Sequence, residues 1–144
     1  MQSSATGFVA RIDSFCARHQ RLIVALFLAA ALFAFVMACL PRPPQLPGTP
    51  TDKVQHILAF AVLTILASAA WPGRALAIFA GLAAYGAAIE FVQLIPALHR
   101  SGDWRDWVAD VGAVAITLAV VAMVRRAGRG HLAAMKPTDP SPRA

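Results

Sequence analysis

The sequence predicts an all-α, polytopic membrane protein with four transmembrane helices and both termini in the cytoplasm. Of its 144 residues, 58% are hydrophobic and only 14% are charged, whereas charged residues make up about 25% of a soluble domain. The mean hydropathy of +0.62 also favours a protein that is dissolved in lipid. Four apolar runs account for this composition, at residues 22–40, 54–71, 75–95 and 104–124. A helix that crosses a bilayer needs about 20 such residues.

Each apolar run has a recognisable end. The run at 22–40 contains no charged residue; it exceeds the roughly 7–15-residue apolar core of a signal peptide, and further spans follow it, so we expect a transmembrane helix. The second and third runs stop at Pro72 and Pro96, because proline interrupts a helix. The fourth stops at Arg125. Together the four runs predict one transmembrane domain at residues 22–126.

The segments outside the runs differ in character. Residues 1–21 form a cytoplasmic N-terminal segment in which Ile12 and Phe15 recur at helical spacing. This segment is either an amphipathic helix on the membrane surface or a polar tail without fixed structure. Residues 41–50 are rich in proline and predict a stiff extended loop. Residues 127–144 predict a disordered cytoplasmic tail.

Positive charge is distributed unevenly between the two sides of the membrane. Most of the 13 Lys and Arg residues flank the side that holds both termini, and such an excess marks the cytoplasmic side. We therefore expect a multi-pass membrane protein with membrane lipids as partners. The basic residues flank the apolar runs and form no stripe, so nucleic acid is not an expected partner. Cys16 and Cys39 show no metal-binding or disulfide spacing and are interpreted as packing residues.

Polar residues gather at the opposite, outward side of the predicted bundle. Most of the seven acidic residues lie there, at or just below the membrane surface. The polar residues of this side are Asp52, Lys53, His56, Glu90, Gln93, His99, Arg100, Asp103, Arg105, Asp106 and Asp110. Placing ionisable groups within a membrane costs free energy, so we first interpret such residues as parts of a functional site.

Helical spacing divides these polar residues into three stripes. Asp52 and His56 share a face of the second span, Glu90 and Gln93 share a face of the third, and the aspartates at 103, 106 and 110 share a face of the fourth. Simpler roles compete for several of them: Asp52 and Asp103 can cap helices, the residues at 53, 100 and 105 can reach the headgroups, and the three tryptophans can anchor the interface. The plausible core of a site is His56, Glu90, Arg100, Asp106 and Asp110.

Small residues predict close helix packing in the third span. Ala80, Ala84 and Ala88 are four residues apart, and Gly81 and Gly86 lie near them. Rows of small residues allow membrane helices to approach closely. We expect this contact to bring the end of the third span towards the second and fourth spans.

The polar residues, in this order, resemble a known family. The pattern consists of Asp52-Lys53-x-x-His56-x-x-x-Phe60, Glu90-x-x-Gln93, and Arg100 followed by Asp106-x-x-x-Asp110. It resembles the VanZ-like family of small bacterial membrane proteins over about residues 52–120. The resemblance implies a multi-pass protein of the bacterial inner (plasma) membrane with a link to the cell envelope. The founding member is associated with resistance to the glycopeptide teicoplanin. The family usually has Asn at the position of Asp110 and Gly at that of Ala113, so this site is more acidic than the resemblance implies.

Three functions are compatible with these residues. In the first, the outward-facing site binds an envelope ligand such as a lipid headgroup, a cell-wall precursor or a glycopeptide; Lys53, His56 and Arg100 would take an anionic group, and Glu90 with Gln93 would orient it. In the second, the side chains at 56, 90, 106 and 110 bind a divalent metal and the protein is a membrane hydrolase, although no HExxH run supports this. In the third, the cluster only holds the helices together. No cofactor or catalytic residue is predicted.

Overall fold

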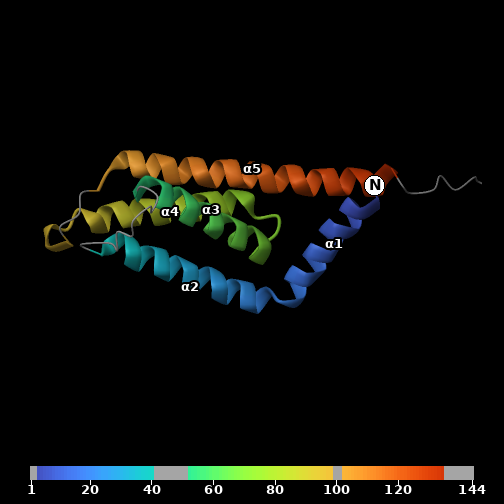
Figure 1. Ribbon diagram of the computed structural model, residues 1–144, viewed down its shortest axis with the longest axis horizontal. Helices are drawn as coiled ribbons and strands as arrows, with labels where there is room; N and C mark the ends of the chain where they lie inside the picture. The colour runs from blue at the N-terminus through green and yellow to red at the C-terminus, as the bar shows by residue number, and fades with distance from the viewer. Residues whose placement is uncertain (1–2, 41–51, 99–101, 135–144) are drawn as a thin grey trace, which may run out of the picture.

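The computed structural model describes residues 3–40, 52–98 and 102–134, and these parts of the chain are helical throughout, apart from short connections. The elements in chain order are α1 (Ser3–Arg18), α2 (Gln20–Cys39), α3 (Asp52–Ala70), α4 (Ala75–Gln93), the 3₁₀ helix η1 (Pro96–Leu98) and α5 (Trp104–Ala134) (Figure 1). The predicted all-α class is confirmed. The proline-rich loop predicted at 41–50 lies outside the described residues.

Four helices are long and apolar enough to cross a membrane. These candidate spans are Gln20–Cys39, Lys53–Ala70, Ala75–Gln93 and Trp104–Gly128. Their mean hydropathies are 2.9, 1.6, 1.9 and 2.2, so the span in α3 is the least apolar. The prediction of a polytopic protein with four spans is therefore confirmed. The side of the membrane on which the termini lie remains a prediction.

The last helix is longer than the sequence predicts. Helix α5 extends to Ala134, so residues 127–134, which we expected in a disordered tail, are helical instead. This segment contains Ala, Leu and Arg, which favour helix, but also Gly128 and Gly130, which disfavour it. The next proline is Pro137, so no proline interrupts the helix before Ala134. At about 1.5 Å per residue, a helix of 31 residues exceeds the roughly 30 Å thickness of the bilayer core.

Helix α5 forms one side of the molecule along its whole length. Helices α3 and α4 pack against it, and α2 lies on the other side of α3 (Figure 1). Helix α1 runs at an angle from the start of α2 to the far end of α5 and contacts both α5 and α3. Gln20 ties the start of α2 to the end of α3, because its Nε2 donates to the Ala70 carbonyl oxygen at 2.8 Å. Of the two alternatives for residues 1–21, the helix is the one that forms.

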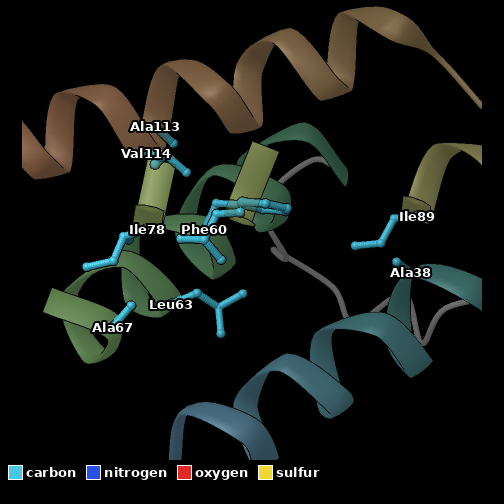
Figure 2. Packing of buried hydrophobic residues seen from close by; sticks show 9 residues of the cluster. Ala38, Phe60, Leu63, Ala67, Ile78, Ile89, Ala113 and Val114 are labelled. Carbon is cyan, nitrogen blue, oxygen red and sulfur yellow. The ribbon is translucent and has the colours of Figure 1, made fainter. Parts of the chain in front are cut away.

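The hydrophobic core lies where α3 meets α2, α4 and α5 (Figure 2). Its members are Ala38, Phe60, Leu63, Ala67, Ile78, Leu82, Ile89, Ala113 and Val114. Phe60 is 2% exposed. Its ring packs so tightly against α4 that a Cβ on Gly86 would lie 3.3 Å from the Phe60 Cζ. Many large apolar side chains on the outer faces of the helices are exposed, as expected for surfaces that face lipid.

The helix face that packs in α4 is not the one predicted. Ala80, Ala84 and Ala88 are exposed, whereas Gly86 is buried beside Phe60. The small residues at 80, 84 and 88 therefore do not form the contact of α4 with α3 and α5. The larger residues of the opposite face fill this contact, because burial of Ile and Leu side chains contributes more packing than burial of alanine.

Candidate polar site

Three helix ends meet at one end of the bundle, which we call the polar end. Helix α3 begins there, α4 ends there and α5 begins there (Figure 1). The sequence places its intramembrane charges at these helix ends, so the fold brings residues that are far apart along the chain close together. We call the residues Lys53, His56, Glu90, Asp106 and Asp110 the polar site.

The outer contact of the polar site is an ion pair between α3 and α5. The Lys53 Nζ lies 3.3 Å from the Asp106 Oδ1. The Lys53 side chain is 48% exposed and the Asp106 side chain 22%. Exposed pairs of this kind contribute about 0–1 kcal/mol to stability, because water and ions screen the attraction. The pair orients two helix ends and carries little of the folding energy.

The inner contact lies one turn deeper between the same two helices. The His56 Nδ1 lies 3.4 Å from the Asp110 Oδ2. His56 is 8% exposed and Asp110 is 1% exposed. Positions 53 and 56 share a face of α3, and positions 106 and 110 share a face of α5, so the two pairs form successive contacts along one interface. The other carboxylate oxygen of Asp110, Oδ1, is buried and has no hydrogen-bond partner among the described residues.

Glu90 connects α4 to the beginning of α5. Its Oε2 accepts a hydrogen bond from the Asp103 backbone N–H at 2.7 Å. A Cβ on Gly102 would lie only 2.8 Å from the Glu90 carbonyl oxygen, so only glycine fits this approach. Asp103 in turn accepts a hydrogen bond from the Arg105 backbone N–H through Oδ1, at 2.9 Å. This bond realises the capping role that we considered for Asp103, since a carboxylate satisfies first-turn N–H groups.

The polar site is one electrostatic unit. Glu90 interacts electrostatically with His56, Asp106 and Asp110, and the two aspartates also interact with each other. The Oε1 of Glu90 is buried and lacks a hydrogen-bond partner in the described part of the chain. The site therefore offers two buried carboxylate oxygens that are not satisfied within the described residues. Such oxygens are acceptors, and a donor in contact with them would be held by a charge-assisted hydrogen bond.

Two cavities flank the polar site. One, of about 360 Å³, lies between α4 and the start of α5; it is lined by Ala87, Glu90, Phe91, Leu94, Gly102, Trp104 and Trp107. The other, of about 320 Å³, is an apolar groove between α2 and α3, and His56 and Gln55 line it. Three aromatic residues thus line the same cavity as Glu90, a composition that suits ammonium groups and amphipathic rings.

Not every predicted residue joins the site. Gln93 is buried and its Nε2 donates to the Ala38 carbonyl oxygen at 2.8 Å, so it ties α4 to the end of α2. Arg100 and the side chain of Asp52 lie outside the described residues. Within 3–40, 52–98 and 102–134, no three His, Cys, Asp or Glu side chains gather as a metal site would require. The geometry therefore does not support the metal site considered for residues 56, 90, 106 and 110.

Two residues of this region make contacts that we did not predict from the sequence. Trp107, expected as an interfacial anchor, is half-buried and its Nε1–H donates to the Ala83 carbonyl oxygen at 3.0 Å. Gly102 was not singled out at all, although a glycine directly before a capping aspartate is a signal for close backbone approach. Both residues fix the start of α5 against α4 and thereby position Glu90.

No protein-family model, curated protein or solved structure matches this chain. The interpretation of the polar site therefore depends on the residues and distances described above.

Proposed function

We propose that the chain is a VanZ-like integral membrane protein of the bacterial cell envelope. In this proposal both termini are cytoplasmic and the polar end faces outward. The polar site binds the hydrogen-bond donors of an envelope ligand, namely a lipid headgroup or a cell-wall precursor. The four candidate spans and the excess of arginine at the other end of the bundle support the membrane setting.

The Glu90 carboxylate carries this proposal. One of its oxygens is held by the Asp103 N–H, and the other has no partner among the described residues. The same residue lines the cavity of about 360 Å³ beside Trp104 and Phe91. A buried oxygen without a donor costs about 1–3 kcal/mol, so a ligand that supplies one gains that energy.

The ligand groups that fit are N–H and O–H donors. Lys53 and His56, which we expected to take an anionic group, already face the carboxylates of Asp106 and Asp110. The oxygens left over at this end belong to carboxylates. Ammonium groups, amides and sugar hydroxyls are therefore favoured over phosphates at this site.

A scaffolding role is the second candidate, because several contacts of the site join different helices. The pairs of Lys53 with Asp106 and of His56 with Asp110 connect α3 to α5. The substitution Glu90→Gln separates the two functions. Glutamine keeps the size of the side chain and an oxygen for the Asp103 N–H, but it removes the charge that strengthens ligand binding.

The test compares two lipids that share a phosphate and differ in their donors. Phosphatidylethanolamine has N–H groups and phosphatidylcholine has none. We expect the purified protein to prefer phosphatidylethanolamine, and Glu90→Gln to reduce this preference about tenfold while its melting temperature stays close to that of the parent protein. Native mass spectrometry of lipid complexes measures the preference. Asp13→Asn, the same chemical change near the other end of the bundle, should keep it.

A lipid-linked cell-wall precursor is the second probe for the same variants. Loss of precursor binding in Glu90→Gln, with lipid preference retained, would identify the precursor as the ligand. If Glu90→Gln lowers the melting temperature and binds both probes like the parent protein, the binding proposal is wrong and the scaffold remains. Teicoplanin susceptibility of cells that express each variant tests the proposed link to glycopeptide resistance.

A further inference from the structure

A second polar hollow lies at the opposite end of the bundle, which we call the arginine end. It has a volume of about 160 Å³ and is enclosed by the end of α3, the turn between α3 and α4, the start of α4, and α5. Four of its lining residues have polar side chains: Ser68, Arg74, Arg125 and Arg126. A fifth, Ala75, is the first residue of α4. We call this place the arginine hollow. None of its residues belongs to the polar site.

Positive charge in the arginine hollow exceeds negative charge. Arg125 is held in place, because its Nη2 donates to the Ser68 carbonyl oxygen at 2.9 Å and lies 4.0 Å from the Asp13 Oδ1. Arg74 and Arg126 form no ion pair with any described residue. Three arginines therefore line the hollow, and one half-exposed carboxylate lies near one of them; the excess of positive charge favours an anion.

The start of α4 adds to this positive potential. Helix α4 begins at Ala75, and no side chain caps it. Gly73 has a φ of 83° and lies in the turn that precedes α4. The first turn of a helix leaves backbone N–H groups without intrahelical acceptors. These N–H groups and the dipole of the 19-residue helix create a positive potential at the start of α4, which favours a bound anion.

A buried hydroxyl group provides an independent sign of a missing ligand. Ser68 is 4% exposed, and its Oγ has no hydrogen-bond partner among the described residues. Thr64, one turn earlier in α3, satisfies its hydroxyl by donating to the Phe60 carbonyl oxygen at 2.7 Å. A serine can make the same bond within its helix. The Ser68 hydroxyl does not, and Ser68 lines a hollow whose other polar side chains, those of the three arginines, are donors.

We propose that the arginine hollow binds the phosphate group of an anionic phospholipid. A phosphate has several acceptor oxygens and so can satisfy guanidinium groups, helix N–H groups and a serine hydroxyl together. A lipid is favoured over a soluble phosphate because Leu118, Val121 and Ala122, within the span of α5, form the apolar wall of the hollow. Basic pockets between transmembrane helices are suited to such headgroups.

The first test removes the two arginines that form no ion pair with a described residue. The double substitution R74Q/R126Q is compared with the parent protein in mild detergent, with phosphatidylglycerol or phosphatidylcholine added. Each arginine near a membrane surface contributes enough attraction to change affinity about fivefold, so we expect the double variant to bind phosphatidylglycerol about 25-fold more weakly. Native mass spectrometry or the lipid-dependent rise in melting temperature measures this loss.

Arg105→Gln is the control for charge outside the hollow. It removes one positive charge at the polar end, where Arg105 lies over the Trp104 ring, whereas the double variant removes two. We expect it to bind phosphatidylglycerol like the parent protein. If R105Q weakens binding about fivefold, the loss expected from one arginine in the hollow, the attraction comes from total charge and the proposed site is wrong.

The second test uses the serine. Ser68→Ala removes a hydroxyl that has no partner in the described residues, so the melting temperature without anionic lipid should stay the same or rise. Affinity for phosphatidylglycerol should fall about tenfold, because a hydrogen bond to a charged group is lost. A fall in melting temperature with unchanged lipid affinity would show that Ser68 is structural and would contradict the proposal.

Inorganic phosphate distinguishes the source of the anion. We expect it to produce no rise in melting temperature at concentrations where phosphatidylglycerol does, because it lacks the acyl chains that the apolar wall contacts. A rise with inorganic phosphate and none with phosphatidylglycerol would overturn the assignment to a lipid. All these measurements concern the arginine end, so they are independent of Glu90 and of the ligand preference tested there.

Discussion

The two ends of the helix bundle handle charge in opposite ways. At the polar end, Lys53 and His56 each face a carboxylate of α5. At the arginine end, Arg74 and Arg126 have no carboxylate partner among the described residues, and the Ser68 hydroxyl is unsatisfied. Paired side chains within the chain hold helices together, whereas an excess of positive charge favours the binding of an anionic ligand. Substitutions in the two pairs of the polar end should therefore affect stability, and substitutions of Arg74 and Arg126 should affect ligand binding.

The largest effect is expected at the buried pair. Asp110→Ala leaves His56 without its carboxylate and opens space beside a residue that is 1% exposed. We expect a loss of about 3–5 kcal/mol in unfolding free energy, because a buried polar pair loses one of its two members. Unfolding of the purified protein in detergent, followed by circular dichroism, measures this loss.

Asp110→Asn is the matched control for that substitution. Asparagine preserves the volume and an acceptor oxygen for the His56 Nδ1–H. We expect it to cost about 1 kcal/mol or less, in line with a volume-conserving change. Equal losses in the alanine and asparagine variants would show that the contact with His56 contributes little.

The second effect concerns the close approach of Gly102 to α4. Gly102→Ala would place a Cβ 2.8 Å from the Glu90 carbonyl oxygen, so backbone must move. We expect a loss of about 1–3 kcal/mol, as for other overpacked sites. Gly112→Ala is the control, because nothing lies within 4 Å of its added Cβ.

In the interior of α5, this control change should stabilise the protein by up to about 1 kcal/mol, since alanine favours helix. Thermal unfolding in the same detergent compares the two variants. A Gly102→Ala protein as stable as Gly112→Ala would mean that the start of α5 is not fixed against α4 as described.

A smaller effect is expected at the exposed ion pair. Lys53→Gln removes the contact with Asp106 Oδ1, and we expect a loss of about 0–1 kcal/mol because the pair is screened. The difference between the parent protein and this variant should shrink further in high salt. A loss as large as that of Asp110→Ala would contradict the distinction between the outer and inner contacts.

The smallest effect on stability is expected at the arginine end. Without anionic lipid, the R74Q/R126Q variant should unfold within about 0.5 kcal/mol of the parent protein, because surface substitutions away from packed contacts change stability little. With phosphatidylglycerol present, the parent protein should become more stable than the variant by mass action. Unfolding curves with and without this lipid measure both effects and complete the comparison of the two ends.

Much of the fold follows from composition and apolar run length. The four spans could be predicted because lipid selects long apolar helices, and their ends follow Pro72, Pro96 and the capping Asp103 closely. The end of α5 could not be predicted in the same way. Beyond the apolar run, a helix depends on intrinsic propensity and on packing, and α1 supplies packing at that end.

The residues of the polar site could be predicted from the sequence, but the contacts between them could be predicted only in part. Helical spacing correctly placed His56 on one face of α3 and Asp110 on one face of α5, and the fold brings these faces together. Spacing within a helix cannot show which helix a side chain meets. Gln93 shares a face with Glu90 but bonds to Ala38 of α2, and the contact of Gly102 with Glu90 depends on how two backbones pass each other.

The contact of His56 with Asp110 has a consequence for how the protein is made. The two residues are 54 positions apart, and α3 is the least apolar of the four spans, with mean hydropathy 1.6. The ribosome delivers α3 to the insertion machinery well before it has synthesised α5. During that interval the Asp110 carboxylate is not yet present to contact His56. Placing a polar side chain in the lipid without such a contact costs free energy. We expect α3 to enter the bilayer stably only after α5 arrives, so a nascent chain truncated before residue 104 should integrate poorly.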